Sequence, residues 1–209
     1  MASPRRIGAP EAKNRRLLLD AAEQLLLEEG HTAISSRRVA ARANLKPQLV
    51  HYYFRTMDEL VLAVFRRRAD DGLAAQAAAL ASPQPLWALW RFSTDPYAVA
   101  ITMAFVGLAS RREAVRAEIA AYSEKFRTAQ TAALSDVLAR YDLPSDRYPP
   151  SVMIVLLTAV SRVVLMEEAL GFVTGHTETL AMVEDFIRAL EGDPLPEYAP
   201  LPPSAAFPR

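Results

Sequence analysis

Residues 35–54, SSRRVAARANLKPQLVHYYF, decide the fold of this chain. Their pattern predicts two short helices joined by a tight turn, the first beginning at Ser35 or Ser36 and the second at Pro47. Two short helices that cross closely need a small side chain at the crossing point, and Ala40 stands there. Other residues fall at spacings that point inward from both helices and the turn: Val39, Ala43, Leu45, Val50 and Tyr53.

The outward side of the second short helix carries Lys46, Gln48, Leu49, His51 and Tyr52. This is the arrangement of a helix-turn-helix, whose second helix lies in the major groove of DNA with its N-terminal residues at the base edges. Lys and Gln are suitable donors to base edges, and Ser, Tyr, Arg and His side chains bind phosphate. A plain helical hairpin with a polar outer face is the alternative.

Charge is distributed unevenly along the chain. Residues 1–69 contain 13 Lys and Arg against 7 Asp and Glu, whereas the remaining residues contain 11 against 17. A basic arm precedes the two short helices and contains Arg5, Arg6, Lys13, Arg15 and Arg16. Because such arms reach the phosphates of DNA, we expect the first third of the chain to bind a polyanion. The runs Arg66–Arg68 and Arg111–Arg112 are interpreted as solvated helix faces.

The composition excludes several classes of protein. Of 209 residues, 51% are apolar and 23% are charged, which is typical of a globular chain. Cysteine is absent and the three histidines are scattered, so we expect neither a metal site nor a thiol nucleophile. His176 is interpreted as a loop or helix-cap residue rather than a metal ligand with Glu178. The apolar stretch 152–166 is too short for a membrane span, and the N-terminus has no secretory signal, so a cytoplasmic protein is expected.

Helical periodicity recurs along nearly the whole chain and predicts an all-α protein of about nine helices. The expected helices lie at about 11–29, 36–43, 47–54, 58–80, 86–92, 96–110, 113–141, 151–170 and 177–191. Gly30, just past the first of them, is typical of a helix end. The tail, residues 192–209, contains six prolines and is expected to be extended or disordered.

The first third of the chain resembles the TetR-type transcriptional regulators. The resemblance is carried by LLLDAAEQLLLEEG (17–30) followed by HTAISSRRVAARANLKPQLVHYYFRTMDELVLAV (31–64), and it covers about residues 15–65 without a gap. It implies a basic flexible arm over 1–10, a DNA-binding domain with three helices over 11–55, and a helical effector-binding and dimerisation domain over 56–191. It also implies a homodimer that binds a near-palindromic double-stranded DNA operator and is released by a small molecule.

The resemblance also implies which residues touch DNA. Base contacts are expected from Arg37, Gln48, Leu49 and His51, and backbone contacts from Ser36, Lys46, Tyr52 and Tyr53. Three positions depart from the pattern of the family. His51 stands where Tyr is usual, Gln48–Leu49 replaces a commoner pair of small residues, and Met57 stands where a phosphate-binding Lys is frequent.

The remainder of the chain is rich in aromatic residues and methionine. These residues either fill a core or line an apolar cavity of the kind that helical bundles offer to small ligands. Since few charges interrupt residues 87–108, a largely hydrophobic effector is expected. The candidate ligand-binding residues are Trp87, Trp90, Met103, Phe105, Tyr122, Phe126 and Met166.

The last two predicted helices carry more apolar surface than one buried face requires. They are either internal core helices of a monomer or, as we expect with the resemblance included, half of a four-helix dimer interface. The candidate interface residues are Val152, Val155, Leu156, Val160, Val163, Leu180, Val183, Ile187 and Leu190.

These observations favour a ligand-responsive regulator, and specifically a repressor. A helical small-molecule binding protein without DNA function is the alternative, but it leaves the basic arm and the turn motif unexplained. No phosphate-binding glycine loop, nucleophile elbow or metal-ligand spacing is visible, so we expect neither an enzyme nor a cofactor.

Overall fold

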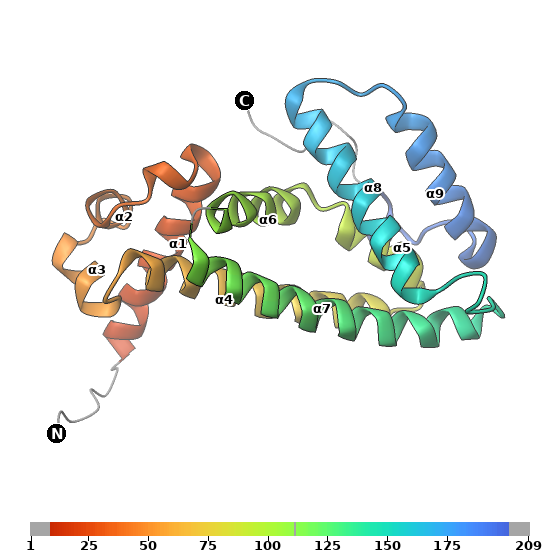
Figure 1. Cartoon of the computed structure of the whole chain (residues 1–209), viewed down its shortest axis with the longest axis horizontal. Coiled ribbons are helices and arrows are strands. Elements are labelled where there is room, and N and C mark those ends of the chain that lie inside the picture. The colour runs from red at the N-terminus through yellow and green to blue at the C-terminus, as the bar shows by residue number, and fades with distance from the viewer. Residues whose placement is uncertain (1–8, 111, 201–209) are drawn as a thin grey trace. The chain divides into compact units, whose positions relative to one another are not determined.

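The computed structural model describes residues 9–110 and 112–200 of the chain (Figure 1). Within these residues every regular element is helical, which confirms the all-α prediction. The chain divides into two units, residues 1–69 with 101–120 and residues 70–100 with 121–209. Three long helices contribute residues to both units: α4 (Met57–Leu80), α6 (Pro96–Ala109) and α7 (Glu113–Arg140).

The first unit is built around α1 (Ala9–Glu29), α2 (Ser36–Arg42) and α3 (Pro47–Tyr53). Short η1 (His31–Ala33) connects α1 to the segment before α2. One face of α1 is buried against the other helices, with Leu18 and Ala22 almost completely inaccessible to solvent. Gly30 follows α1 with φ of 77°, a backbone conformation that glycine adopts without strain.

The beginning of α4 is fixed by two reciprocal hydrogen bonds. Thr56 Oγ1 accepts from the backbone N–H of Glu59 at 3.1 Å, and Glu59 Oε2 accepts from the N–H of Arg55 at 2.7 Å. Such contacts satisfy amide groups that have no partner within the helix, so they set where the helix begins. The same core receives Phe105 and Val115 from the parts of α6 and α7 that belong to this unit.

The second unit is organised around α5 (Pro85–Ser93), which contacts α8 (Pro150–Leu170), α9 (His176–Glu191) and short η2 (Pro196–Tyr198). Trp87 and Trp90 of α5 are buried at its centre. The α9 residue Glu191 accepts hydrogen bonds from the N–H groups of Leu86 and Trp87 and from the hydroxyl of Tyr141, at 2.9, 3.1 and 2.6 Å. One carboxylate therefore caps α5 and also ties the end of α7 to α9.

The first part of the tail differs from the expectation of extended or disordered chain. The Gln84 side-chain amide donates to the carbonyl groups of Glu191 and Asp193, and its oxygen accepts from the N–H of Leu195. The Trp87 indole donates to the Gly192 carbonyl at 2.9 Å. These contacts hold residues 192–195 against α5, and the rest of the tail prediction, from residue 201, falls outside the described residues.

Across the described ranges, no single helix is both long and apolar enough to cross a membrane. Helices α5 and α6 would meet that length and composition only together, and they are bent by 52° at their junction.

Candidate nucleic-acid interface

Helices α2 and α3 form the compact two-helix element that the sequence predicts. Ser35 caps α2, with its hydroxyl accepting from the N–H of Arg38 at 3.4 Å. The turn passes through Asn44, whose φ of 53° is in the left-handed region that Asn tolerates. Ala40 is fully buried, as a close crossing requires, and its carbonyl accepts from the N–H of Leu45 at 2.8 Å.

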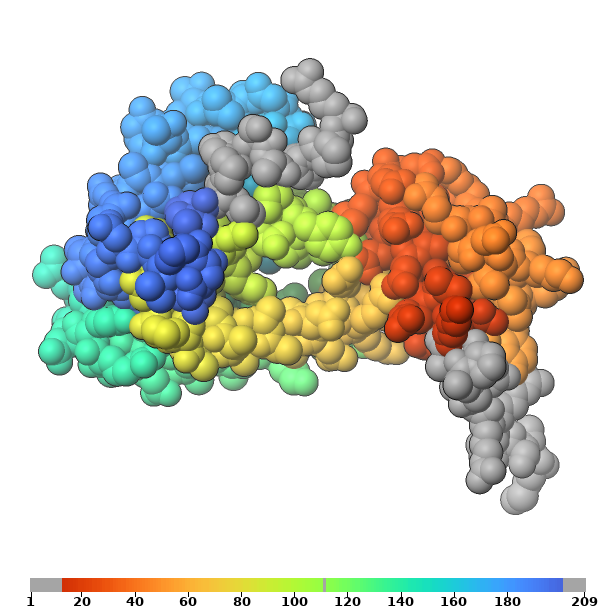
Figure 2. All heavy atoms as spheres, turned by 180° about the vertical axis from the view of Figure 1, so that it is seen from behind, coloured from red at the N-terminus to blue at the C-terminus, as the bar shows by residue number. Residues whose placement is uncertain are grey.

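The outer face of this element is open to solvent. Figure 2 shows α2 and α3, coloured orange, at the surface of the first unit. Gln48 and His51 on α3 are exposed, as is Lys46 immediately before it. These side chains, with Arg37 on α2, are therefore accessible to the major groove of a DNA duplex without any rearrangement of the core.

Other predicted contact residues are only partly accessible. Leu49 and Tyr53 pack partly against the core of the unit, and Ser36 is half-buried. Tyr52 is 44% exposed, and its ring meets that of Tyr53 edge to face at 5.0 Å between centroids. The structure thus brings the eight predicted DNA contacts onto one element, with Leu49 and Tyr53 also serving the core.

Two arginines of α2 are already neutralised by α1. Arg42 Nη2 lies 2.7 Å from Glu28 Oε2, and Arg38 is paired with Glu29. The hydrogen bond from Arg42 holds the pKa of Glu28 below its usual range. Arg37, by contrast, is exposed and forms no ion pair within the described part of the chain. The sequence gives no direct signal for this difference between neighbouring arginines.

The arginines of α4 correct the prediction of a solvated face. Arg67 lies 2.8 Å from Glu23 and 2.6 Å from Asp20 of α1, and Arg68 is also paired with Glu23. Arg66 is paired with Glu118 of α7 at 2.6 Å and lowers the pKa of that carboxyl. Arg112 is likewise paired with Asp58 rather than solvated alone, and Arg111 falls outside the described residues. Because the Glu23 side chain is only 3% exposed, its two arginines compensate an otherwise costly buried charge.

The predicted dimer-interface residues separate into two groups. On α8, Val152, Val155, Leu156 and Val163 are between 45% and 55% exposed, and Val160 is half-buried. On α9, all four predicted residues pack into the core of their own unit: Leu180, Val183, Ile187 and Leu190. The large apolar residue that α9 exposes is instead Met182.

The candidate ligand-binding residues lie in both units. Phe105 is buried in the first unit, where it meets Phe65 at 5.2 Å between ring centroids, and Met103 is exposed there. In the second unit Trp87 and Trp90 fill the core, and Met166 is exposed. Two members interact with other helices of that unit: Phe126 stacks on Phe92, and the Tyr122 hydroxyl donates to Asp70 at 2.9 Å.

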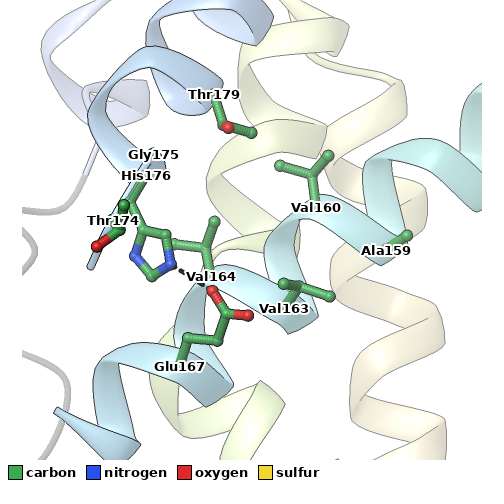
Figure 3. Close-up of a pocket in the computed structure, with 9 residues that line it drawn as sticks. All are labelled: Ala159, Val160, Val163, Val164, Glu167, Thr174, Gly175, His176 and Thr179. Carbon is green, nitrogen blue, oxygen red and sulfur yellow. Dashed lines mark hydrogen bonds and ion pairs between the residues drawn. The ribbon is translucent and has the colours of Figure 1, made fainter. Parts of the chain in front are cut away.

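A groove of about 310 Å³ opens between α8 and the beginning of α9 (Figure 3). Its walls are mostly apolar and include Val160 and Val163, which the sequence assigns to the dimer interface. At one end buried His176 places Nε2 2.7 Å from Glu167 Oε2. No group of three or more metal-binding side chains occurs among residues 9–110 and 112–200. His176 and Glu167 therefore form a polar pair at the edge of an apolar groove, with Glu168 Oε1 4.0 Å from the other ring nitrogen of His176.

Comparison with known sequences places this geometry in context. Residues 18–64 match the family described as "Bacterial regulatory proteins, tetR family". The HTH-type transcriptional regulator BetI of Rhizobium meliloti is 32% identical over 127 residues, which are 56% of this chain and 63% of that protein. The matched stretch therefore spans less than two thirds of the length of this relative.

Solved structures show the same fold over most of the chain. A putative transcriptional regulator from Saccharomonospora viridis, in complex with choline, superposes with a TM-score of 0.67 at 16% identity, covering 85% of this chain and 96% of that one. A putative transcriptional regulator from Pseudomonas aeruginosa gives 0.65 at 18% identity, covering 88% and 92%. At these identities the likeness concerns the fold alone.

Proposed function

We propose that this chain is a TetR-type transcriptional regulator, and specifically a repressor that binds a near-palindromic operator as a homodimer and is released by a small, largely apolar molecule. Its place of action is the cytoplasm, where the DNA lies. The observation that carries the proposal is the open outer face of α2 and α3. This face presents Arg37, Gln48 and His51 to solvent, while neighbouring arginines are neutralised by α1.

We assign the base contacts to Arg37, Gln48, Leu49 and His51, and the phosphate contacts to Ser36, Lys46, Tyr52 and Tyr53. The exposed side chains at the beginning of α3 match the way a recognition helix presents its N-terminal residues to the major groove. The half-buried members, Leu49 and Tyr53, can contribute only the part of their surface that remains outside the core.

A homodimer is supported by the exposed apolar face of α8. Val155 and Leu156 are each more than half exposed, and Val152 and Val163 extend the same face. A two-fold dimer would present two copies of α3 to two half-sites related by the same symmetry.

Release follows from linkage between two binding equilibria. An effector weakens DNA binding only to the extent that it prefers a conformation with lower operator affinity. Helix α4 is suited to couple the two events because it is continuous from Met57 to Leu80 and contributes to both units.

The deciding experiment measures binding to the DNA immediately upstream of the protein's own gene by fluorescence anisotropy, at two salt concentrations and with a random duplex as control. We expect selective binding that weakens steeply with salt, because phosphate contacts release counterions. If operators selected from random DNA also bind no better than the random duplex, the proposal is wrong. A helical small-molecule binding protein is then the better interpretation.

A further inference from the structure

An ion pair joins the beginning of α2 to the end of α1, next to residues that we assign to DNA. Arg38 Nη2 pairs with Glu29 Oε2, and the backbone N–H of Arg38 donates to Ser35 Oγ at 3.4 Å. Arg38 follows Ser36 and Arg37 in the first turn of α2, so it lies about 3 Å from Ser36 along the helix axis. The ion pair is therefore directly beside two of the proposed DNA contacts.

Both members of this pair are exposed to solvent. Their side chains are 48% exposed for Arg38 and 37% exposed for Glu29. Such pairs contribute little to stability, because water competes for both charges and two long side chains must be held in one geometry. The pair of Arg67 with Glu23 is different, since the Glu23 side chain is only 3% exposed and would be left as a buried charge. Arg38 can therefore leave its carboxylate at much lower cost than Arg67 can.

A second arginine stays with Glu29 when Arg38 leaves. Arg42 Nη2 lies 3.6 Å from Glu29 Oε1 and 2.7 Å from Glu28 Oε2. Both glutamates are in the last turn of α1, where the helix dipole disfavours negative charge and α1 has no basic residue. Arg42 compensates both carboxylates and keeps α1 joined to α2, so the scaffold of the first unit does not depend on Arg38.

We propose that Arg38 is a further contact to the DNA backbone, and that it exchanges the carboxylate of Glu29 for a phosphate when the duplex binds. The first helix of a helix-turn-helix crosses the DNA backbone, so α2 brings this guanidinium close to phosphates. Carboxylate and phosphate both accept paired hydrogen bonds from the planar guanidinium, and the duplex offers many phosphates. Glu29 therefore lowers the affinity for every duplex by the cost of opening the pair.

This inference rests on the proposed function, because the exchange requires a DNA duplex. The two can nevertheless fail separately. A parent protein without selective, salt-dependent DNA binding contradicts both. If the parent protein binds an operator selectively, the proposed function holds and the variants decide the exchange alone.

The experiment is a double-mutant cycle on the full chain, with Glu29→Gln, Arg38→Gln and the variant that carries both changes. Fluorescence anisotropy measures binding to an operator selected from random DNA and to a random duplex, over a series of salt concentrations. We expect Glu29→Gln to tighten binding to both duplexes by about twofold to fivefold, since the pair no longer has to open. In the Arg38→Gln background the same substitution should lose most of this gain.

The salt dependence distinguishes a phosphate contact from a structural role. The slope of log affinity against log salt should be steeper by about 1 in Glu29→Gln than in the double variant, because only the former retains the Arg38 contact. Glu113→Gln is the matched control for net charge, since its side chain is 88% exposed in the same unit, and it should leave both affinities unchanged. Circular dichroism checks that every variant keeps the helical content of the parent.

Three results would overturn the proposal. Weaker operator binding by a folded Glu29→Gln would show that the pair positions α2 and is needed intact. An equal gain from Glu29→Gln with and without Arg38 would show that the carboxylate acts only by repelling DNA. An equal gain in Glu113→Gln would show that net charge alone changes the affinity.

Discussion

Arg37 and Arg38 are neighbours in the chain, yet their surroundings differ. Arg38 is paired with Glu29, whereas Arg37 is exposed and forms no ion pair among the described residues. The basic excess of the first third therefore overstates the charge that is available to DNA. Only the three-dimensional structure reveals which arginines are neutralised. Glu28 and Glu29 precede α2 by several residues, and the packing of α1 against α2 brings them next to its arginines.

His51 is the residue whose substitution best tests base recognition. His51→Ala should cost about 1–3 kcal/mol of binding free energy at one base step in each half-site, and it should lower discrimination between operator and random duplex. Lys46→Ala, which removes a proposed phosphate contact, should weaken binding to both duplexes alike and reduce the salt slope by about 1. Anisotropy titrations over a salt series measure both effects. An equal loss on both duplexes for His51→Ala would contradict its assignment.

Glu23 should contribute strongly to the stability of the first unit. Its buried carboxylate is held by Arg67 and Arg68, so Glu23→Ala removes the acceptor that both arginines share, while Arg67 stays paired with Asp20. We expect a loss of about 1.5–3 kcal/mol in the free energy of unfolding, measured by urea denaturation. Asp20→Asn is the matched control, because the Asp20 side chain is 47% exposed and such pairs contribute at most about 1 kcal/mol. If both variants lose a similar amount of unfolding free energy, burial does not make the ion pairs of Glu23 stronger than that of exposed Asp20.

At the scale of helices, ends were easier to predict from the sequence than faces. Thr56, Gly30 and Pro47 mark their helix ends through local chemistry that the sequence displays directly. The inward face of α9 was different, because Leu180 and Ile187 suit a dimer seam and a core equally well. The role of Glu191 was also beyond prediction, since its partners lie about a hundred residues away in α5.

The junction of α5, α7 and α9 should make stability depend on alkaline pH. Burial and the hydrogen bond to Glu191 raise the pKa of Tyr141 above its ordinary value of 10.0. The stabilisation that Tyr141 adds to the folded state is therefore complete below about pH 10. It is lost as the pH rises toward the higher pKa that Tyr141 has in the folded state. Tyr141→Phe should cost about 1–2 kcal/mol at neutral pH and reduce this alkaline loss.

Thermal unfolding between pH 8 and 11 measures the effect of Tyr141→Phe. Tyr148→Phe is the control, since the Tyr148 hydroxyl makes no hydrogen bond within the described residues, and its variant should keep the alkaline slope of the parent. An unchanged slope in Tyr141→Phe would show that other groups cause the loss.

For the whole molecule, the proposed dimer depends on the exposed face of α8. Leu156→Glu should shift the sedimentation profile toward the monomer, because it places a charge in apolar surface that would be buried on association. It should not lower the unfolding temperature of the monomer, since the Leu156 side chain is 55% exposed there. Val106→Glu, on the exposed side of α6, is the control and should sediment as the parent does. A dimer that tolerates Leu156→Glu must associate through another surface.

The position of the two tryptophans provides an optical probe of one unit alone. The chain contains only Trp87 and Trp90, both buried in the core around α5, so tryptophan emission reports on the second unit and is silent about α1, α2 and α3. Far-ultraviolet circular dichroism reports on helices everywhere. If the emission and dichroism curves coincide during denaturation, the first and second units unfold cooperatively. If they separate, one half of the protein can unfold while the other persists, and the order of the two transitions identifies which half is the weaker.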